Sequence, residues 1–406
     1  MKLRQWLAPV AALALVVVAL AGCGGKGGSG GGANEIVVGV YGSMTGNDAT
    51  FGQSTKGGVE VALADLVEQA GGKIGGLPVR LVVEDDQGKA EEAATAAQKL
   101  INQDQVVALL GEVASSRSLA AAPICQAAGV PMISPSSTNP KVTQVGDRIF
   151  RMCFLDDFQG LTMARFAVQN LGLKRVAILK DVKSDYSVGL AQYFTDEFVK
   201  LGGTIVVEQA YTAGDQDFSA QLTAIKSKNP DAIFIPGYYT EVGLIARTAR
   251  QQGITVPLLG GDGWESEKLI EIGQDAINGA YYSNHWALDM PDTNLQAFLT
   301  KYHAKYNSDP DAIGGLAYDA ARVLFASMQK MAAEEPAVFA GLGSAKAGTP
   351  ERKAALDRLR DLIAATQNYA GVTGSITLDA NRNASKPAVV IEIKGGKKVY
   401  NTTIHP

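Results

Sequence analysis

The sequence predicts an α/β protein made of two doubly wound lobes, each built on a parallel sheet. Short apolar runs rich in β-branched residues alternate with alanine-rich helical stretches, and the same pattern restarts near residue 175. With 406 residues the chain is also too long for one ordinary core, so two domains are expected. Continuous apolar strands separated by helices are typical of a parallel sheet that helices cover on both faces.

The first unit is expected to contain four strands with helices between them. The strands are predicted at residues 36–41, 79–84, 106–110 and 130–134. After the first strand, apolar residues recur at helical spacing from Val59 to Ala70, and the pair Gly71-Gly72 is expected to end that helix.

The second unit repeats this order. Its strands are predicted at 175–180, 204–208, 232–236 and 257–260, and its helices at 187–201, 217–228 and 240–252. The segment around 151–159 is expected to cross from one unit to the other. A long helix at 317–333 and a late strand pair at 374–378 and 388–393 complete the chain.

Polar and aromatic clusters follow several of these strands. The third strand is followed by Glu112 to Ser116, and the fourth by the stretch Ser134-Pro-Ser-Ser-Thr-Asn-Pro140. In the second unit, the residues that follow strands are Tyr186, Tyr238, Tyr239, Asp262 and Trp264. Because ligands of doubly wound sheets bind at the carboxyl ends of the strands, these clusters predict a site between the two units. Hydroxyls would lie on one side of it, and aromatics with one acid on the other.

Each cluster also has a purely structural interpretation. The hydroxyl residues are suitable helix caps, the tyrosines suit packing with a hydrated hydroxyl, and Asp262 suits a cap of the next helix. Thr138 or Asn139 is placed to cap a short helix that directly follows. The adjacent acids Asp85-Asp86 and Asp156-Asp157 are interpreted as solvated turns or helix caps.

Composition and missing motifs argue against several function classes. The net charge is −4 and no basic cluster occurs, so nucleic acid is not an expected partner. There is no Walker A string and no G-x-G-x-x-G on a strand–helix turn. The three histidines have no ligand spacing, so neither a metal nor a histidine-dependent nucleophile is expected. We therefore expect no cofactor and no catalysis.

The N-terminus reads as an export signal. Lys2 and Arg4 precede an apolar run from residue 6 to residue 20, which is short for a membrane span and ends in small residues. We expect residues 1–22 to be removed and residues 23–34 to form a glycine-rich tether. The ending Leu-Ala-Gly-Cys23 resembles the lipobox of bacterial lipoproteins, which implies lipidation of Cys23. The protein would then be anchored to a bacterial membrane on its periplasmic or outer side.

Two further cysteines, Cys125 and Cys153, would meet an oxidising compartment after export, so a disulfide between them is one expectation. Two buried free thiols are the alternative, since sequence does not show whether their Cβ atoms meet.

Several longer stretches resemble the leucine/isoleucine/valine-binding proteins of bacterial ABC transporters. In order, they include VGVYGSMTG, LVVEDDQGKAEEA, GEVASSRSLAAAPICQAAGVPMISPSSTNP, DYSVGLAQYF and GSITLDANRN. The similarity runs from about Glu35 to the C-terminus. It implies a type I periplasmic-binding-protein fold with three crossovers between lobes. The N-terminal lobe would comprise residues 35–155 and 286–383, and the C-terminal lobe residues 156–285 and 384–406.

The resemblance also implies a set of ligand-binding residues. Ser115 would bind a ligand carboxylate with backbone help from Val113 or Ala114, and Ser136 and Thr138 would bind the same carboxylate or the ammonium. The remaining implied contacts are Tyr186 and Tyr238 along the pocket, Asp262 on the α-ammonium and Phe51 over the ligand side chain. This placement of the ligand's two charged groups is physically reasonable, because helix N-termini favour anions and a buried ammonium needs a counter-charge.

Two departures from the family pattern leave the ligand open. Asp262 stands where leucine-type binders have the longer Glu, so the ligand would sit deeper or water would fill the gap. Trp264 is large and is expected to narrow or floor the pocket for the ligand side chain.

The expected function is therefore a lipid-anchored solute-binding protein that captures an amino acid, branched-chain in the first instance, and delivers it to an ABC permease. Two alternatives stay open. A binding subunit of the same fold could recognise amides, urea or short aliphatic acids, and loss of the ammonium partner would favour it. An exported hydrolase is the other alternative, and a turnover assay would detect it.

We predict that Cys23→Ser moves the exported protein from the membrane fraction to the soluble fraction, because a thioether-linked lipid would have no attachment point. Fractionation of expressing cells with an antibody against the protein checks this. A mutant that stays membrane-bound after removal of its signal would show that Cys23 is not the anchor.

Overall fold

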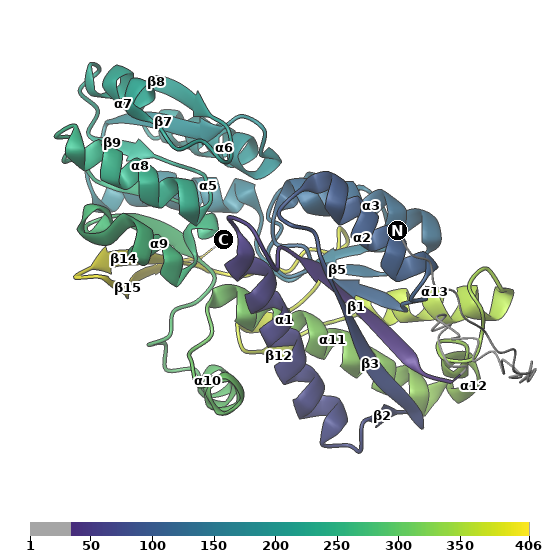
Figure 1. The fold of residues 1–406 in the computed structure, drawn as a ribbon. Coiled ribbons are helices and arrows are strands. Elements are labelled where there is room, and N and C mark those ends of the chain that lie inside the picture. Colours follow the sequence, from purple (N-terminus) through teal and green to yellow (C-terminus); the bar gives the residue numbers. More distant parts are fainter. Residues whose placement is uncertain (1–33, 406) are drawn as a thin grey trace, which may run out of the picture.

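The computed structural model describes residues 34–405, which form two lobes side by side (Figure 1). The signal, the tether and Cys23 lie outside the described residues, apart from the tether's last residue, Asn34. Each lobe is a mainly parallel sheet between helices, so the predicted class of two doubly wound lobes is confirmed.

The first lobe is built on a six-stranded sheet in the order β2-β3-β1-β4-β5-β6. Its strands are β1 (Ile36–Gly42), β2 (Lys73–Ile74), β3 (Leu77–Asp85), β4 (Ala108–Leu110), β5 (Met132–Ser134) and β6 (Ile149–Arg151). All neighbours are parallel except β2 and β3. The pair α2 (Ala90–Asn102) and α3 (Ser115–Ala128) packs on one face, and α1 (Ala49–Leu63) with α11 (Ala312–Glu334) covers the other (Figure 1). The short helix α4 (Lys141–Gln144) precedes β6.

The second lobe is built on a seven-stranded sheet in the order β15-β14-β11-β10-β9-β7-β8. Its strands are β7 (Arg175–Asp181), β8 (Thr204–Tyr211), β9 (Ala232–Phe234), β10 (Leu258–Gly260), β11 (Tyr281–Asn284), β14 (Ala388–Lys394) and β15 (Lys397–Ile404). The strands β7 to β11 pair with one another in parallel. The strand β14 is antiparallel to both of its neighbours, β11 and β15. The helices around it are α5 (Asp156–Arg165), α6 (Asp185–Lys200), α7 (Ser219–Lys226), α8 (Tyr239–Gln251) and α9 (Glu267–Gly273).

The chain passes between the two sheets three times: after β6, after β11 and before β14. Between the second and third passage it returns to the first lobe, where α11 packs against α1, β4 and β5. The other elements of this stretch are α10 (Thr293–Tyr306), α12 (Pro336–Ala340), α13 (Pro350–Ala364), β12 (Tyr369–Gly371) and β13 (Gly374–Ile376). On this basis we propose lobe limits of 35–155 with 286–383, and 156–285 with 384–406.

The eight strands predicted for the two units are present, each overlapping its expected range. The late strands, however, are not partners of each other. β13 pairs with β12 in a two-stranded hairpin, while β14 lies between β11 and β15 in the second sheet. The strands β2, β6, β11 and β15 were not predicted.

The predicted disulfide is not present in the structure. Cys125 and Cys153 are both free and fully buried, the first near the end of α3 and the second just after β6. Burial raises the pKa of each thiol to about 12, so both are poor thiolate formers. The alternative of two buried free thiols describes the structure.

Helices α1 and α11 pack at very short range because glycine lies at the crossing. A Cβ placed on Gly58 would stand 2.1 Å from the carbonyl oxygen of Gly314 and 2.8 Å from the backbone N of Tyr318. Backbone atoms of a packed helix cannot move aside cheaply, so Gly58 sets the distance between α1 and α11. At Gly314 itself an added Cβ would find ordinary contacts, the nearest at 3.4 Å.

We predict that Gly58→Ala destabilises the protein by about 1–3 kcal/mol, because overpacking outweighs the gain in helix propensity. Gly314→Ala is the matched control on the facing helix, and it should be neutral or slightly stabilising. Chemical denaturation of the three proteins measures both effects. Equal stability of the two variants would contradict a steric limit at the crossing.

Candidate ligand-binding site

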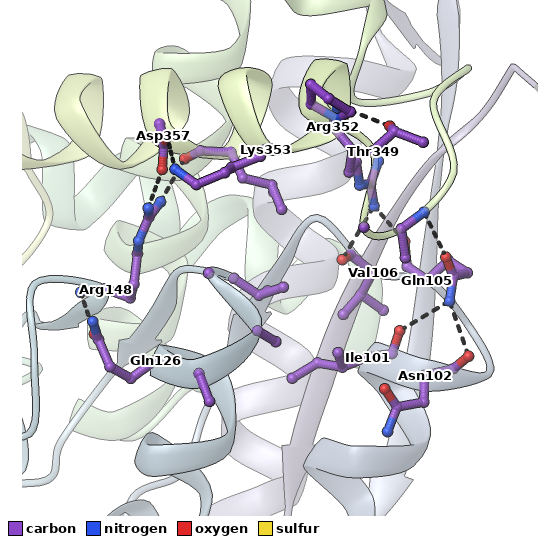
Figure 2. A pocket seen from close by; sticks show the side chains of 18 of the residues that line it. Ile101, Asn102, Gln105, Val106, Gln126, Arg148, Thr349, Arg352, Lys353 and Asp357 are labelled. Atoms are coloured by element: carbon purple, nitrogen blue, oxygen red, sulfur yellow. Dashed lines mark hydrogen bonds and ion pairs between the residues drawn. The ribbon is translucent and has the colours of Figure 1, made fainter.

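The groove drawn in Figure 2 lies at the amino ends of the first sheet, because Val106 and Arg148 come shortly before β4 and β6. Arg148 pairs with Asp357 of α13, and Arg352 of the same helix donates to the carbonyl oxygens of Gln105 and Val106 (Figure 2). Burial without a carboxylate partner lowers the pKa of Arg352 to about 10. These bonds fasten α13 to the sheet. Ligands of doubly wound sheets bind at the opposite end, so we regard this groove as structural.

A smaller cavity lies between the lobes at the carboxyl ends of the strands. It is small, with a volume of only about 10 Å³. Its lining residues are Val113, Ser136, Tyr186, Tyr238, Asp262 and Gly263. Five of these six were predicted as ligand-binding residues, and they come from both lobes. This cavity is therefore the candidate site.

The hydroxyls that follow β5 divide into two functions. Ser134 and Ser137 both donate to the carbonyl oxygen of Glu112, at 2.6 and 2.9 Å, and thus hold the loop after β4 in place. Ser136 instead donates to Asp262 Oδ2 of the other lobe at 3.2 Å. The hydroxyl of Thr138 is buried and has no hydrogen-bond partner. Ser134 and Ser137 therefore stabilise the loop after β4, whereas Ser136 and Thr138 have no such structural bond.

Ser115 is the first residue of α3, and its hydroxyl accepts a hydrogen bond from the backbone N–H of Asn139 at 3.2 Å. The Asn139 side chain in turn accepts from the backbone N–H of Lys141 at 3.0 Å, which forms a turn just before α4, whose N-cap is Pro140. The backbone N–H of Ala114 donates to the Glu112 carboxylate. The Ala114 N–H could donate to a ligand carboxylate, as expected, only if its bond to Glu112 broke. Val113, the other residue expected to contribute its backbone, lines the cavity.

Asp262 is almost fully buried and is the centre of a hydrogen-bond network across the cleft. Gln159 Nε2 donates to Oδ1 at 2.7 Å, while Oδ2 lies 3.0 Å from His285 Nε2 and 3.2 Å from the Ser136 hydroxyl. Ser136 belongs to the first lobe, Gln159 to α5 and His285 to the second crossover. The carboxylate is thus held from both lobes and from a connecting segment.

Sequence reasoning missed His285 and Gln159. The histidines had been considered as metal ligands or catalysts, whereas His285 stacks on Phe154 with ring centroids 4.0 Å apart and faces a carboxylate. His285 directly follows β11, and this position at a strand end could have predicted that it lies near the site. Trp264 was expected to narrow or floor the pocket; it does not line the cavity, and a role beneath the ligand side chain stays a prediction. Its indole donates to the carbonyl oxygen of Ile235 at 2.9 Å, within the buried core of the second lobe.

An aromatic wall forms the second-lobe side of the cavity. Tyr186 and Tyr238 stack with ring centroids 5.4 Å apart. Phe51 of α1 reaches across from the first lobe and meets Tyr238 and Tyr239 edge-on, at 5.4 and 5.2 Å. Phe51 is fully buried there. Phe51 packs against Tyr238, which lines the cavity, but does not line it itself, and its contact with a ligand side chain stays a prediction.

A buried ionic cluster lies beside this wall. Arg117 of α3 pairs with Asp48 and Glu112, and its guanidinium lies 5.8 Å from the ring centroid of Tyr238. Burial raises the pKa of Glu112 to about 8, although Arg117 opposes this shift, and the charge of Asp86 adds to it. Arg117 therefore connects the first lobe electrostatically to an aromatic of the second.

Further polar contacts join the lobes around the cavity. Ser116 donates to the Asp185 carboxylate at 3.0 Å, and Asn139 donates to the Asp185 carbonyl at 2.8 Å. Thr240 donates to the carbonyl of Asn47 at 2.8 Å. The lobes are thus in contact on more than one side of the cavity.

Within residues 34–405, no group of three His, Cys, Asp or Glu side chains is arranged to hold a metal ion. None of the helices in this range combines the length and the apolarity needed to span a bilayer.

Two α/β lobes, three crossovers and a cavity at facing strand ends are the arrangement of a two-lobed solute-binding protein. The model of the periplasmic binding protein family matches residues 35–398, and the chain belongs to this family. An amino acid binding protein of Pseudomonas aeruginosa is 35% identical over 236 residues, which are 58% of this chain and 62% of that protein. The Leu/Ile/Val-binding protein BraC3 of Rhizobium johnstonii is 33% identical over 305 residues, 75% of this chain and 81% of the relative.

Solved structures agree with the type I periplasmic-binding-protein fold. The leucine-binding protein LivK of Thermotoga maritima has a TM-score of 0.82 and 38% identity, over 91% of this chain and 99% of that one. The binding protein LivJ of Streptococcus pneumoniae, solved with isoleucine, has a TM-score of 0.81 and 31% identity, over 92% and 100%. A Rhodopseudomonas palustris protein solved with benzoate is 22% identical with a TM-score of 0.78, over 92% and 97%, and shows the fold alone.

We predict that Glu112→Gln flattens the pH dependence of stability between about pH 5 and pH 8. In this range folded Glu112 keeps a proton that the unfolded chain has lost, so the free energy of unfolding falls as pH rises, and glutamine removes that contribution. Denaturation at several pH values measures the slope, with the exposed Glu91→Gln as control. Parallel profiles of wild type and Glu112→Gln would contradict the raised pKa.

Proposed function

We propose that this protein captures an α-amino acid, a branched-chain one in the first instance, in the cavity between its lobes and delivers it to an ABC permease. The observation that carries the proposal is the Asp262 carboxylate, buried at the interlobe cavity opposite the hydroxyls of the first lobe. A zwitterion offers one anion and one cation, and this cavity offers a partner for each.

The carboxylate end would bind where α3 begins. Ser115 is the first residue of this helix, whose free N–H groups and positive end favour an anion. The ammonium end would face Asp262, because a buried cation without a counter-charge is costly. Val113 and the wall of Tyr186, Tyr238 and Phe51 would surround an apolar side chain.

The relatives support an aliphatic amino acid as ligand. LivJ was solved with isoleucine, and BraC3 is named a Leu/Ile/Val-binding protein. Export with a lipid on Cys23 and delivery to a permease belong to the same proposal, and they rest on the N-terminal motif and on the family.

A second candidate follows from one observation. Asp262 already accepts hydrogen bonds from Gln159 and Ser136 and lies within bonding distance of His285, so the carboxylate is satisfied without any ammonium. A ligand that lacks an amino group, such as an amide, urea or a short aliphatic acid, would leave this network intact. A thermal-shift screen over all amino acids and these compounds separates the two candidates. A ligand at a hundredfold its Kd should stabilise by roughly 2.7 kcal/mol.

We predict that leucine, isoleucine or valine gives the largest stabilisation in this screen. We further predict that Asp262→Asn weakens the binding of that amino acid by roughly tenfold or more, because a hydrogen bond to a charged group is lost in a desolvated site. Isothermal calorimetry measures the affinity, and the exposed Asp289→Asn is the control. A loss below about threefold, or an amide as the best ligand, would favour the second candidate.

A further inference from the structure

The cavity between the lobes is too small for an amino acid in the described conformation. Its volume of about 10 Å³ is close to the least that a single water molecule needs. A ligand can therefore enter only when the lobes move apart, and the contacts that span the two lobes decide how readily they do so. One such contact lies outside the cavity, at the beginning of α11.

Helix α11 packs in the first lobe, but its first N–H group is bound by the second lobe. Asp311 is the N-cap residue, and its Oδ1 accepts from the backbone N–H of Gly314 at 2.8 Å. The N–H of Ala312 has no partner within its own helix, and it donates to Oε1 of Glu265 at 3.3 Å. Glu265 comes shortly after β10 in the second lobe. The first turn of α11 is therefore capped from both lobes.

The second lobe holds the Glu265 carboxylate without help from the first. Oε2 accepts from the Tyr282 hydroxyl at 2.6 Å and from Asn284 Nδ2 at 2.9 Å, and Lys398 Nζ lies 3.0 Å from Oε1. Burial would raise the pKa of Glu265, but the charge of Lys398 outweighs it and keeps the pKa below its ordinary value. When the lobes separate, this carboxylate loses one N–H and keeps three donors. The contact with α11 can therefore open without leaving a buried charge unpartnered.

A second carboxylate stands at the same helix end. Oδ2 of Asp311 accepts from the Ser54 hydroxyl of α1, so this group is held by the first lobe. Asp311 keeps partial access to a groove of about 740 Å³ between α1 and α9, so its carboxyl group can exchange a proton with solvent. Lys398 is paired with Glu265 and with Glu267, at 3.0 and 2.7 Å. Its single charge therefore does not also neutralise Asp311.

We propose that Asp311 and Glu265 form a pH-sensitive contact that regulates closure of the two lobes. Ionised Asp311 repels Glu265 and weakens its hold on α11, whereas protonated Asp311 leaves Glu265 as the one negative charge at the helix end. Mild acid thus favours the closed form and tightens ligand binding. The effect on binding rests on the proposed function, and the effect on the lobes does not.

The surroundings of Asp311 give the direction of the effect. Burial raises the pKa of Asp311 to about 6, and the charge of Glu265 adds to the rise. The hydrogen bonds from Ser54 and Gly314 and the charge of Lys398 oppose it. Because Glu265 belongs to the other lobe, its share of the rise is present only while the lobes are together. Closure therefore takes up protons around pH 6, and the closed form loses this advantage as the pH rises through that value.

Several elements contribute charged or titratable groups around Asp311. They are Glu265 and Glu267 of the second lobe, Lys398 of β15, Tyr282 of β11, Tyr302 of α10 and Lys56 of α1.

Small-angle X-ray scattering of the ligand-free protein at about pH 5 and pH 7.5 tests the proposal. The variant is Asp311→Asn, because asparagine caps a helix as well as aspartate does but carries no charge. Asp292→Asn is the matched control, since Asp292 is the exposed N-cap of α10 and accepts from the backbone N–H of Leu295 at 2.9 Å. We expect wild type and Asp292→Asn to have a smaller radius of gyration at pH 5 than at pH 7.5. Asp311→Asn should have the smaller radius at both pH values.

Calorimetry with L-isoleucine measures the same effect on binding. Wild type and Asp292→Asn should bind roughly three- to tenfold more tightly at pH 5 than at pH 7.5. Asp311→Asn should bind at pH 7.5 about as tightly as wild type does at pH 5. Asp311→Ser, which also caps a helix without charge, is the second variant and should behave like Asp311→Asn.

A wild-type radius that does not change with pH would overturn the inference, and so would variants of Asp311 whose pH profiles run parallel to that of wild type. Failure of wild type to bind L-isoleucine, leucine or valine would instead overturn the proposed function. The scattering experiment needs no ligand and still decides on the inference in that case.

Discussion

A buried carboxylate that must be partnered from both lobes is the constraint on which the rest of this structure depends. Asp262 is removed from water, and an isolated ion there would be prohibitively costly. Its contacts come from the first lobe through Ser136, from α5 through Gln159 and from the second crossover through His285. The lobes can only approach each other with these groups in register. The loop that carries Ser136 is itself held by Ser134 and Ser137, which both donate to the carbonyl oxygen of Glu112.

The fold could be predicted from the sequence because apolar strands and amphipathic helices alternate regularly along the chain. Strands such as 36–41 and 175–180 are continuous apolar runs, and a parallel sheet brings their carboxyl ends to one edge. That rule brought together the stretches that hold Tyr186, Tyr238 and Asp262 with the stretch after β5, and the resemblance to the family singled out Ser136 within it; all four line one cavity, although they are far apart in the chain. The strands β2, β6, β11 and β15 were missed, and length is not the reason, since several predicted strands also have only three residues.

The rest of the site was not predictable for a definite physical reason. His285 lies in the second crossover, outside any strand or helix, and Gln159 lies in the first turns of α5, where a helical position does not tell which lobe the side chain faces. Asp156 and Asp157 are neighbours of identical chemistry, and only the tertiary fold decides that one is buried and the other exposed. Similarly, the pairing of Cys125 with Cys153 was plausible from compartment alone, but the thiols belong to different parts of the first lobe and its exit.

The three crossovers also determine the order in which the two cores can be completed. One face of the first sheet is covered by α11, whose residues 312–334 come after almost the whole second lobe in the chain. The second sheet, in turn, lacks β14 and β15 until the last residues are present. A growing chain therefore cannot bury either core from its N-terminal half, and contacts of very long sequence separation must form last. Such a chain stays incompletely folded until synthesis ends, which is the state in which a polypeptide can still be threaded through a membrane pore.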